Sequence, residues 1–155
     1  MAKYDVCIIG TGRVGLPLGL SFVEAGLSVS GVDVDKKIRD KVNNGRMPFH
    51  EPGYDNIIAT KQFKVHATPD DVIPNSAAII ITVGTPLHNH IETDLSQIQQ
   101  VLEGLKKYLI QDQLIVLRST VAPGTTMYVK KWIEQTTKFS VGKDIFLCFH
   151  VKIVS

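Results

Sequence analysis

The sequence lacks the features that mark membrane, secreted and nucleic-acid-binding proteins. Its 155 residues include only two cysteines, and basic and acidic side chains nearly balance at a formal net charge of +2. No apolar run approaches the roughly 20 residues that a membrane-spanning helix needs. The N-terminal apolar run is interrupted by Asp5 and ends at Gly10, unlike the continuous core of a secretory signal. We therefore expect neither a membrane nor a nucleic acid as a partner.

Cysteine and histidine are too few and too scattered to build a metal centre. Cys7 and Cys148 both fall in apolar stretches typical of strands, so we expect both to be buried free thiols that act as small hydrophobic groups. Such cysteines suit a reducing cytoplasm, which is the predicted location. His88 and His90 stand in a polar stretch and supply too few ligands, so no metal site is predicted.

The most informative stretch is the glycine turn at 10–15, Gly-Thr-Gly-Arg-Val-Gly, which joins the apolar run 4–9 to a helix-prone run. A strand, a Gly-x-Gly-x-x-Gly turn and a helix in this order form the fingerprint of a dinucleotide-binding βαβ unit. Gly10 permits the tight turn, Gly12 leaves room for a pyrophosphate, and Gly15 lets the helix pack closely on the sheet. The N–H groups at the start of the helix then face the phosphates.

Asp33 supplies the second part of this fingerprint. It follows the strand predicted at 27–32, about 20 residues beyond the first glycine, where an acidic side chain accepts hydrogen bonds from the adenosine ribose hydroxyls. A carboxylate here would repel a 2′-phosphate, so we predict NAD rather than NADP, although Lys36 and Lys37 lie close by in the sequence. The alternative is that Asp33 only caps the helix predicted at 35–43.

Strands and helices alternate along the rest of the chain. Further strands are expected at 63–68, 77–83, 113–118 and 145–149, with helices at 54–60, 95–109 and 126–137. The run at 77–83 is continuously apolar, as in a strand buried on both faces of a parallel sheet. We predict an α/β fold with a doubly wound parallel sheet of about six strands, a Rossmann-type domain. Residues 1–155 would form one dinucleotide-binding domain.

Distinctive residues follow four of the predicted strands. Besides the glycine turn and Asp33, these are Gly-Thr-Pro at 84–86 and the pair Ser119 and Thr120. In open parallel sheets, ligands bind at the carboxyl ends of the strands, and all four features lie there. Each of them alone is also explained by ordinary turn chemistry. Their coincidence at one edge favours a binding site.

These motifs, in this order, resemble the UDP-glucose/GDP-mannose dehydrogenase family, the NAD-dependent nucleotide-sugar 6-dehydrogenases. The matching pieces are the glycine turn, Asp33, the loop 44–53 with its Glu-Pro-Gly, Gly-Thr-Pro at 84–86, and Arg-Ser-Thr-Val-Ala-Pro-Gly-Thr at 118–125. Residues 84–87 together with 94–96 are more similar to the N-acetylhexosamine branch, which uses UDP-N-acetylmannosamine or UDP-N-acetylglucosamine, than to the UDP-glucose branch.

The resemblance implies that two NAD take up hydride in turn while the C6 alcohol of a UDP-sugar becomes a carboxylate. Carried over by motif, the cofactor-binding residues would be Gly10, Gly12, Arg13, Val14, Gly15, Asp33, Thr85 and Thr120. Thr120 would also be the catalytic residue, orienting a water beside the nicotinamide, because a hydroxyl donates and accepts at once.

Two departures from the family bear on activity. Its catalytic cysteine, lysine and asparagine belong to a region beyond Ser155, and His150 and Val151 stand where the family has the proline and glutamate of Pro-Glu-Arg. We therefore expect a truncated chain that is inactive alone and binds a UDP-sugar only if the missing central and C-terminal domains complete it. An oligomer is possible, as in full-length members. A stand-alone dinucleotide-binding module and half of a split enzyme stay open as alternatives.

Overall fold

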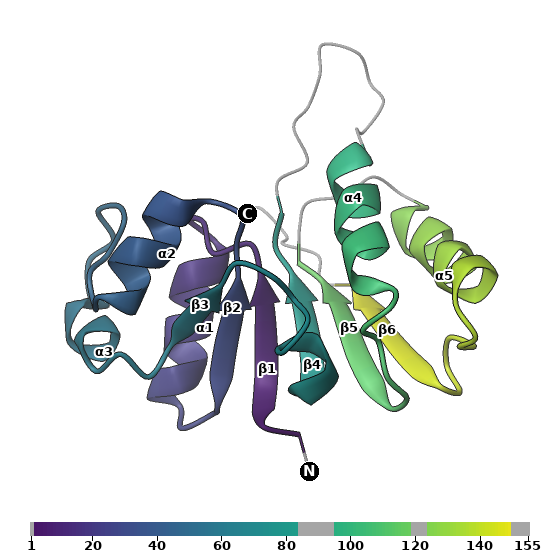
Figure 1. Cartoon of the computed structure of the whole chain (residues 1–155), viewed down its shortest axis with the longest axis horizontal. Helices are drawn as coiled ribbons and strands as arrows, with labels where there is room; N and C mark the ends of the chain where they lie inside the picture. The colour runs from purple at the N-terminus through teal and green to yellow at the C-terminus, as the bar shows by residue number, and fades with distance from the viewer. Residues whose placement is uncertain (1, 84–94, 119–123, 150–155) are drawn as a thin grey trace, which may run out of the picture.

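The computed structural model describes residues 2–83, 95–118 and 124–149. Within these residues the chain forms a parallel six-stranded sheet in the order β3-β2-β1-β4-β5-β6 (Figure 1). The strands are β1 (Tyr4–Ile9), β2 (Val29–Val32), β3 (Lys64–His66), β4 (Ser76–Ile81), β5 (Gln113–Leu117) and β6 (Ile145–Phe149). This confirms the predicted doubly wound α/β sheet.

The helices divide between the two faces of this sheet. They are α1 (Gly15–Glu24), α2 (Lys36–Asn43), α3 (Asp55–Ala59), α4 (Ser96–Leu105) and α5 (Thr125–Thr136), with a 3₁₀ turn, η1, at Ile73–Asn75. Buried residues of α1, α2 and α3 share one hydrophobic cluster, and those of α4 and α5 belong to the other. Figure 1 shows α1 to α3 grouped beside β1 to β3, and α4 and α5 beside β4 to β6.

Strand β1 lies between the two clusters and contributes to both. Val6 and Ile8 pack into the cluster that contains α1, whereas Cys7 and Ile9 pack into the one that contains α4. All four side chains are buried. Because successive side chains of a strand point to opposite faces, an uninterrupted apolar run is what a strand covered on both faces requires.

The strand order reverses between β1 and β4. From β1 the chain runs outward through β2 to β3, then returns to place β4 on the other side of β1 and continues to β6. Ile9 is paired with Ile81 where β1 and β4 end, so both strands finish at the same level. In doubly wound sheets the crevice at such a reversal is where ligands bind.

Helix α4 is shorter than its apolar pattern predicts. It ends at Leu105 rather than Leu109, although Leu109 is still buried. A turn in which Tyr108 N–H donates to Leu105 C=O follows the helix and keeps Leu109 against the core. Helical spacing therefore described the buried face correctly but not the end of the helix. The sequence favours Asp94 as the N-cap of this helix, and Asp94 lies outside the described residues.

The expected burial of Cys148 is wrong. Cys7 is buried, but Cys148 is exposed on β6, at the end of the strand order. Leu147 and Phe149 pack against the cluster beneath α5, so the alternating side chains of Phe146 and Cys148 point to the opposite face. Phe146 is 45% exposed there. An edge position, which the local sequence does not encode, decides the environment of this cysteine.

We expect the two thiols to differ sharply in reactivity. Burial raises the pKa of the Cys7 thiol to about 12, so at pH 8 it stays protonated and inaccessible. A disulfide reagent such as dithionitrobenzoate should therefore label one thiol rapidly in the folded chain and two in urea. Cys148→Ser should abolish the rapid reaction and Cys7→Ser should preserve it. Rapid labelling of Cys7 in the folded chain would contradict its burial.

None of the helices in the described part of the chain combines the length and the hydrophobicity needed to cross a membrane.

Candidate dinucleotide-binding site

A cavity of about 590 Å³ opens at the carboxyl ends of β1, β2 and β4. Gly10, Gly12 and Asp33 line it, so the structure brings together residues that the sequence fingerprint singled out. Thr82 and Val83, which follow β4, lie in the same wall. The volume falls within the usual range of roughly 300–1,000 Å³ for small-molecule sites.

The glycine turn begins with a backbone conformation that suits glycine. Gly10 has φ of +88°, and its N–H donates to Val32 C=O at 2.9 Å, which ties the turn to the end of β2. A side chain at this φ would be strained. Helix α1 then starts at Gly15, with Val14 as its N-cap residue.

Gly12 and Gly15 have opposite surroundings. A Cβ on Gly15 would lie 1.9 Å from the carbonyl oxygen of Gly10 and 2.5 Å from Oγ1 of Thr82, so helix and sheet approach as closely as a glycine allows. A Cβ on Gly12 would meet no atom within 4 Å. The space next to Gly12 is therefore open toward the cavity, which a phosphate group can use.

Arg13 connects the glycine turn to the loop that carries Glu-Pro-Gly. Its guanidinium carbon lies 5.2 Å from the centroid of the Phe49 ring, a cation–π contact. One hydrogen bond holds this loop, from Lys41 Nζ to Pro48 C=O at 3.4 Å. The residue after the loop, Tyr54, has its hydroxyl 3.1 Å from that of Ser21. The loop thus lies close to both α1 and α2.

The carboxylate of Asp33 is held by three donors of the protein. Its Oδ2 accepts from the N–H of Thr11 at 2.6 Å and from Thr11 Oγ1 at 2.9 Å, and its Oδ1 accepts from Asp35 N–H at 2.9 Å. Thr11 is fully buried, whereas Asp33 is half-buried in the cavity wall. A carboxylate has about four acceptor positions, so capacity for a ligand hydroxyl is left.

Asp33 does not cap the helix at 35–43, which was the alternative role considered for it. Asp35 is the N-cap of α2, and its carboxylate accepts from the N–H groups of Lys37 and Ile38. Asp33 instead joins the glycine turn to the segment that leads into α2. Arg39 supports this segment, because its Nη1 donates to the Asp33 carbonyl at 2.9 Å.

Part of the cavity wall was not foreseen from the sequence. Gln97, Gln100 and Gly104 contribute from α4, and Ala67 and Pro69 from the loop after β3. The three α4 residues are spaced three and four apart, which puts them on one face of the helix. Gly104 could have indicated this part of the wall. A glycine inside a helix costs about 1 kcal/mol relative to alanine, so its presence there indicates that a side chain would occupy needed space.

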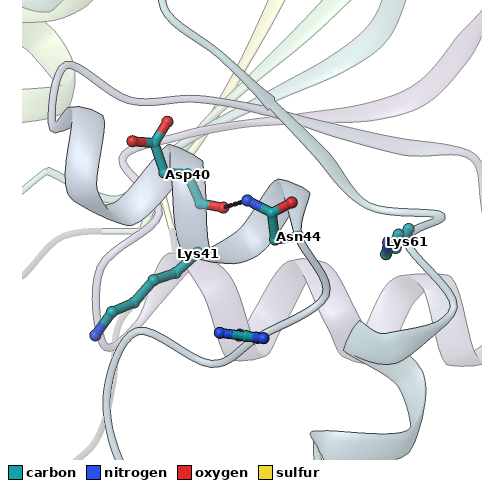
Figure 2. Close-up of a pocket in the computed structure, with 5 residues that line it drawn as sticks. Asp40, Lys41, Asn44 and Lys61 are labelled. Carbon is teal, nitrogen blue, oxygen red and sulfur yellow. Dashed lines mark hydrogen bonds between the residues drawn. The ribbon is translucent and has the colours of Figure 1, made fainter.

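A second cavity, of about 500 Å³, lies between the C-terminal ends of α2 and α3 (Figure 2). Lys41, Arg46 and Lys61 make it basic, and in Figure 2 Lys41 and Lys61 lie on opposite sides of Asn44. The Asn44 amide donates to the Asp40 carbonyl at 2.7 Å. The cations here complement the negative ends of two helices, so their charge is explained by the fold itself.

Comparison with known proteins identifies the relationship. A family model described as the NAD binding domain of the UDP-glucose/GDP-mannose dehydrogenase family matches residues 4–154. The chain belongs to this family. As its NAD-binding domain, the chain has NAD as its cofactor, and the open space beside Gly12 fits a diphosphate.

Relatives within the UDP-glucose/GDP-mannose dehydrogenase family include several sugar specificities. The chain is 34% identical to UDP-N-acetyl-D-mannosamine dehydrogenase of Campylobacter jejuni, over 84% of this chain and 32% of the relative. It is 31% identical to the UDP-glucose 6-dehydrogenase TuaD of Bacillus subtilis, over 90% of this chain and 31% of the relative. The chain thus spans about a third of the length of these relatives.

Solved structures of this dehydrogenase family share the fold. A ternary complex of GDP-mannose dehydrogenase from Pseudomonas aeruginosa has a TM-score of 0.87 at 26% identity, covering 96% of this chain and 36% of that one. The UDP-N-acetyl-mannosamine dehydrogenase Cap5O from Staphylococcus aureus has a TM-score of 0.85 at 30% identity, with the same coverage.

Two residues expected to act in this family's NAD-binding domain lie outside the described residues. The residues expected to act are Thr85 and Thr120. His88 and His90, for which no metal role is predicted, and His150 and Val151, which depart from the family pattern, also lie outside the described residues. Within the described ranges, no group of three or more histidine, cysteine, aspartate or glutamate residues gathers as metal ligands would.

Proposed function

We propose that the cavity between β1 and β4 binds NAD(H), in preference to NADP(H), as the cofactor site of a nucleotide-sugar 6-dehydrogenase. The observation that carries this proposal is the common wall formed by Gly10, Gly12 and Asp33. It places an open glycine backbone next to a carboxylate, and a dinucleotide presents a diphosphate next to a ribose. This pairing of a glycine turn with an acidic residue at the carboxyl edge of the sheet is the one that dinucleotide-binding domains use.

The diphosphate would lie against the turn between Gly12 and Gly15. The first N–H groups of a helix have no intrahelical acceptor, and the helix dipole adds positive potential at the same end. The space beside Gly12 is unobstructed, so phosphate oxygens could approach this backbone closely. Val14, the N-cap residue, is 51% exposed at the start of α1, and Arg13 adds a positive charge to the same turn.

The adenosine would occupy the part of the cavity near β2 and α4. Asp33 would accept from the ribose hydroxyls through its remaining acceptor positions. Val34, Ala67, Pro69 and Val101 supply apolar surface for the base. Val34 is 93% exposed, so apolar surface there is free to be covered by a ligand.

Oxidation of a sugar would draw on regions beyond the third of the relatives' length that this chain spans. When bound, NAD supplies the hydride acceptor. Thr120 would orient a water there, while the sugar site and the catalytic cysteine would come from central and C-terminal domains like those of the family. The UDP-N-acetyl-D-mannosamine dehydrogenase of C. jejuni, at 34% identity, supports a UDP-N-acetylhexosamine as substrate. The free cysteines support a cytoplasmic location.

The proposal is tested by titrating the purified chain with NADH and NADPH and following nicotinamide fluorescence. We expect tighter binding of NADH, and Asp33→Ala should weaken it by about tenfold or more, because a hydrogen bond to a charged group contributes about 1.5–3 kcal/mol. Asp35→Ala is the matched control. It removes the cap of α2 but no residue of the cavity wall, so NADH affinity should be retained. Equal affinities of the natural chain for NADH and NADPH would refute the proposal.

A further inference from the structure

Thr82 makes hydrogen bonds that no motif in the sequence predicted. It follows β4, and its hydroxyl oxygen lies 2.5 Å from the carbonyl oxygen of Gly10 and 3.0 Å from that of Ile9, with one proton to donate. The backbone N–H of Thr82 also donates to Ile9 C=O at 2.9 Å, so this carbonyl has a partner without the hydroxyl. The distinctive contact of the hydroxyl is therefore the one to Gly10.

The Gly10 carbonyl occupies a confined position. It points beneath the first turn of α1, where a Cβ on Gly15 would come within 1.9 Å of it. The same Cβ would lie 2.5 Å from Thr82 Oγ1, so carbonyl, hydroxyl and helix start meet at one point. A carbonyl enclosed in this way needs a donor from the protein, because water has little room to replace one.

The Gly10 carbonyl and the Thr11 N–H belong to one planar peptide group, in which they point in opposite directions. Thr82 donates to the carbonyl end at 2.5 Å. The N–H end donates to Asp33 Oδ2 at 2.6 Å. A single peptide of the glycine turn is thus held from β4 on one side and from the end of β2 on the other.

We propose that Thr82 is a positioning residue for the dinucleotide: its hydroxyl fixes the Gly10–Thr11 peptide, which aligns both the glycine turn and the Asp33 carboxylate. The inference rests on the proposed NAD(H) site and names a residue that controls it. Without the hydroxyl the peptide can rotate, which changes the approach of the diphosphate to Gly12. The same rotation moves the donor that holds Asp33, so ribose recognition changes with it.

The test compares three variants of the chain. Thr82→Ala removes the hydroxyl, Thr82→Ser keeps it, and Thr82→Val replaces it with a methyl group that crowds the Gly10 carbonyl. We expect Thr82→Ala to weaken binding of NADH and of ADP, measured as a competitor, by about tenfold, the effect of one hydrogen bond to a confined carbonyl. The preference for NADH over NADPH should fall as well, whereas Thr82→Ser should match the natural chain.

Two readouts separate positioning from a purely structural role. Competition by adenine, which has neither a diphosphate nor a ribose, should change less than about twofold in Thr82→Ala, because neither the glycine turn nor Asp33 would contact it. Hydrogen exchange at the Thr11 amide, measured without ligand, should be faster in Thr82→Ala than in the natural chain. Loss of stability alone would lower the melting temperature but leave the NADH affinity of the folded protein unchanged.

Three outcomes would overturn the proposal. One is wild-type affinity for NADH in Thr82→Ala, and another is a Thr82→Ser variant as weak as Thr82→Ala, which would assign the effect to the methyl group. The third is equal weakening of ADP and adenine. If Thr82→Val does not fold, Thr82→Ala carries the test, because it introduces no new atom next to Gly15. If the natural chain fails to bind NADH, the proposed function is refuted. If the natural chain binds NADH and Thr82→Ala binds it equally well, only this inference is refuted.

Discussion

Gly15→Ala is expected to destabilise the fold by about 3 kcal/mol or more, the upper end of the usual effect of overpacking. The new Cβ would lie 1.9 Å from the Gly10 carbonyl oxygen, a backbone atom that has no rotamer by which to move away. Helix α1 would have to shift off the sheet and take with it the fully buried side chains of Leu16 and Leu20. A loss of this size is a large part of the roughly 5–15 kcal/mol that stabilises an ordinary domain.

Urea unfolding followed by Trp132 fluorescence would measure this effect. Gly104→Ala is the matched control, because it makes the same change inside helix α4 at a position where a Cβ meets no atom within 4 Å. It should be neutral or stabilise the fold by up to about 1 kcal/mol through helix propensity. Equal unfolding midpoints for Gly15→Ala and the natural chain would show that helix and sheet do not meet as closely as the structure describes.

Gly12→Val should abolish NADH binding and leave the fold intact. A Cβ on Gly12 meets nothing within 4 Å, so the folded chain accepts the side chain without a clash. The valine methyl groups would, however, fill the space through which the diphosphate approaches the backbone. Removing this approach should cost the contacts of the diphosphate with the helix start, a loss on the order of a hundredfold or more in affinity.

The measurement pairs an NADH titration with an unfolding curve for the same variant. Gly12→Ala adds a smaller side chain at the same position and should give an intermediate loss of affinity. Both variants should unfold near the midpoint of the natural chain. A folded Gly12→Val protein with unchanged NADH affinity would mean that the dinucleotide binds elsewhere.

The two glycine substitutions together separate the two functions of one motif. Gly15 is buried between α1 and the sheet, and Gly12 borders the cavity. The spacing Gly-x-Gly-x-x-Gly predicts both roles, because a strand that turns directly into a helix brings its third glycine back over the sheet. The motif itself therefore predicts that Gly15 affects stability and Gly12 affects binding. The structure adds the distances from each glycine to its neighbours.

The role of Asp33 was only partly predictable. Its place after β2 indicated a position at the carboxyl edge of the sheet, where the structure has it lining the cavity. The three hydrogen bonds from Thr11 and Asp35 were not predictable, because they depend on how the glycine turn lies against the end of β2. This arrangement makes Asp33 a structural partner of the turn in addition to its proposed role at the ribose.

The sequence alone determined the fold class, the order of the strands and helices along the chain, and the edge of the sheet where the cavity lies. These follow from local causes: apolar periodicity, the left-handed conformation that suits Gly10, and the rule that parallel strands end at one edge. Only the tertiary structure decided three other matters. Thr82 reaches Gly10 across 72 residues of sequence, Gln97 and Gln100 of α4 complete the cavity, and Cys148 is exposed at the sheet edge. The reason is common to all three: each depends on which strands and helices become neighbours, and that choice is made by packing the whole chain around two shared cores.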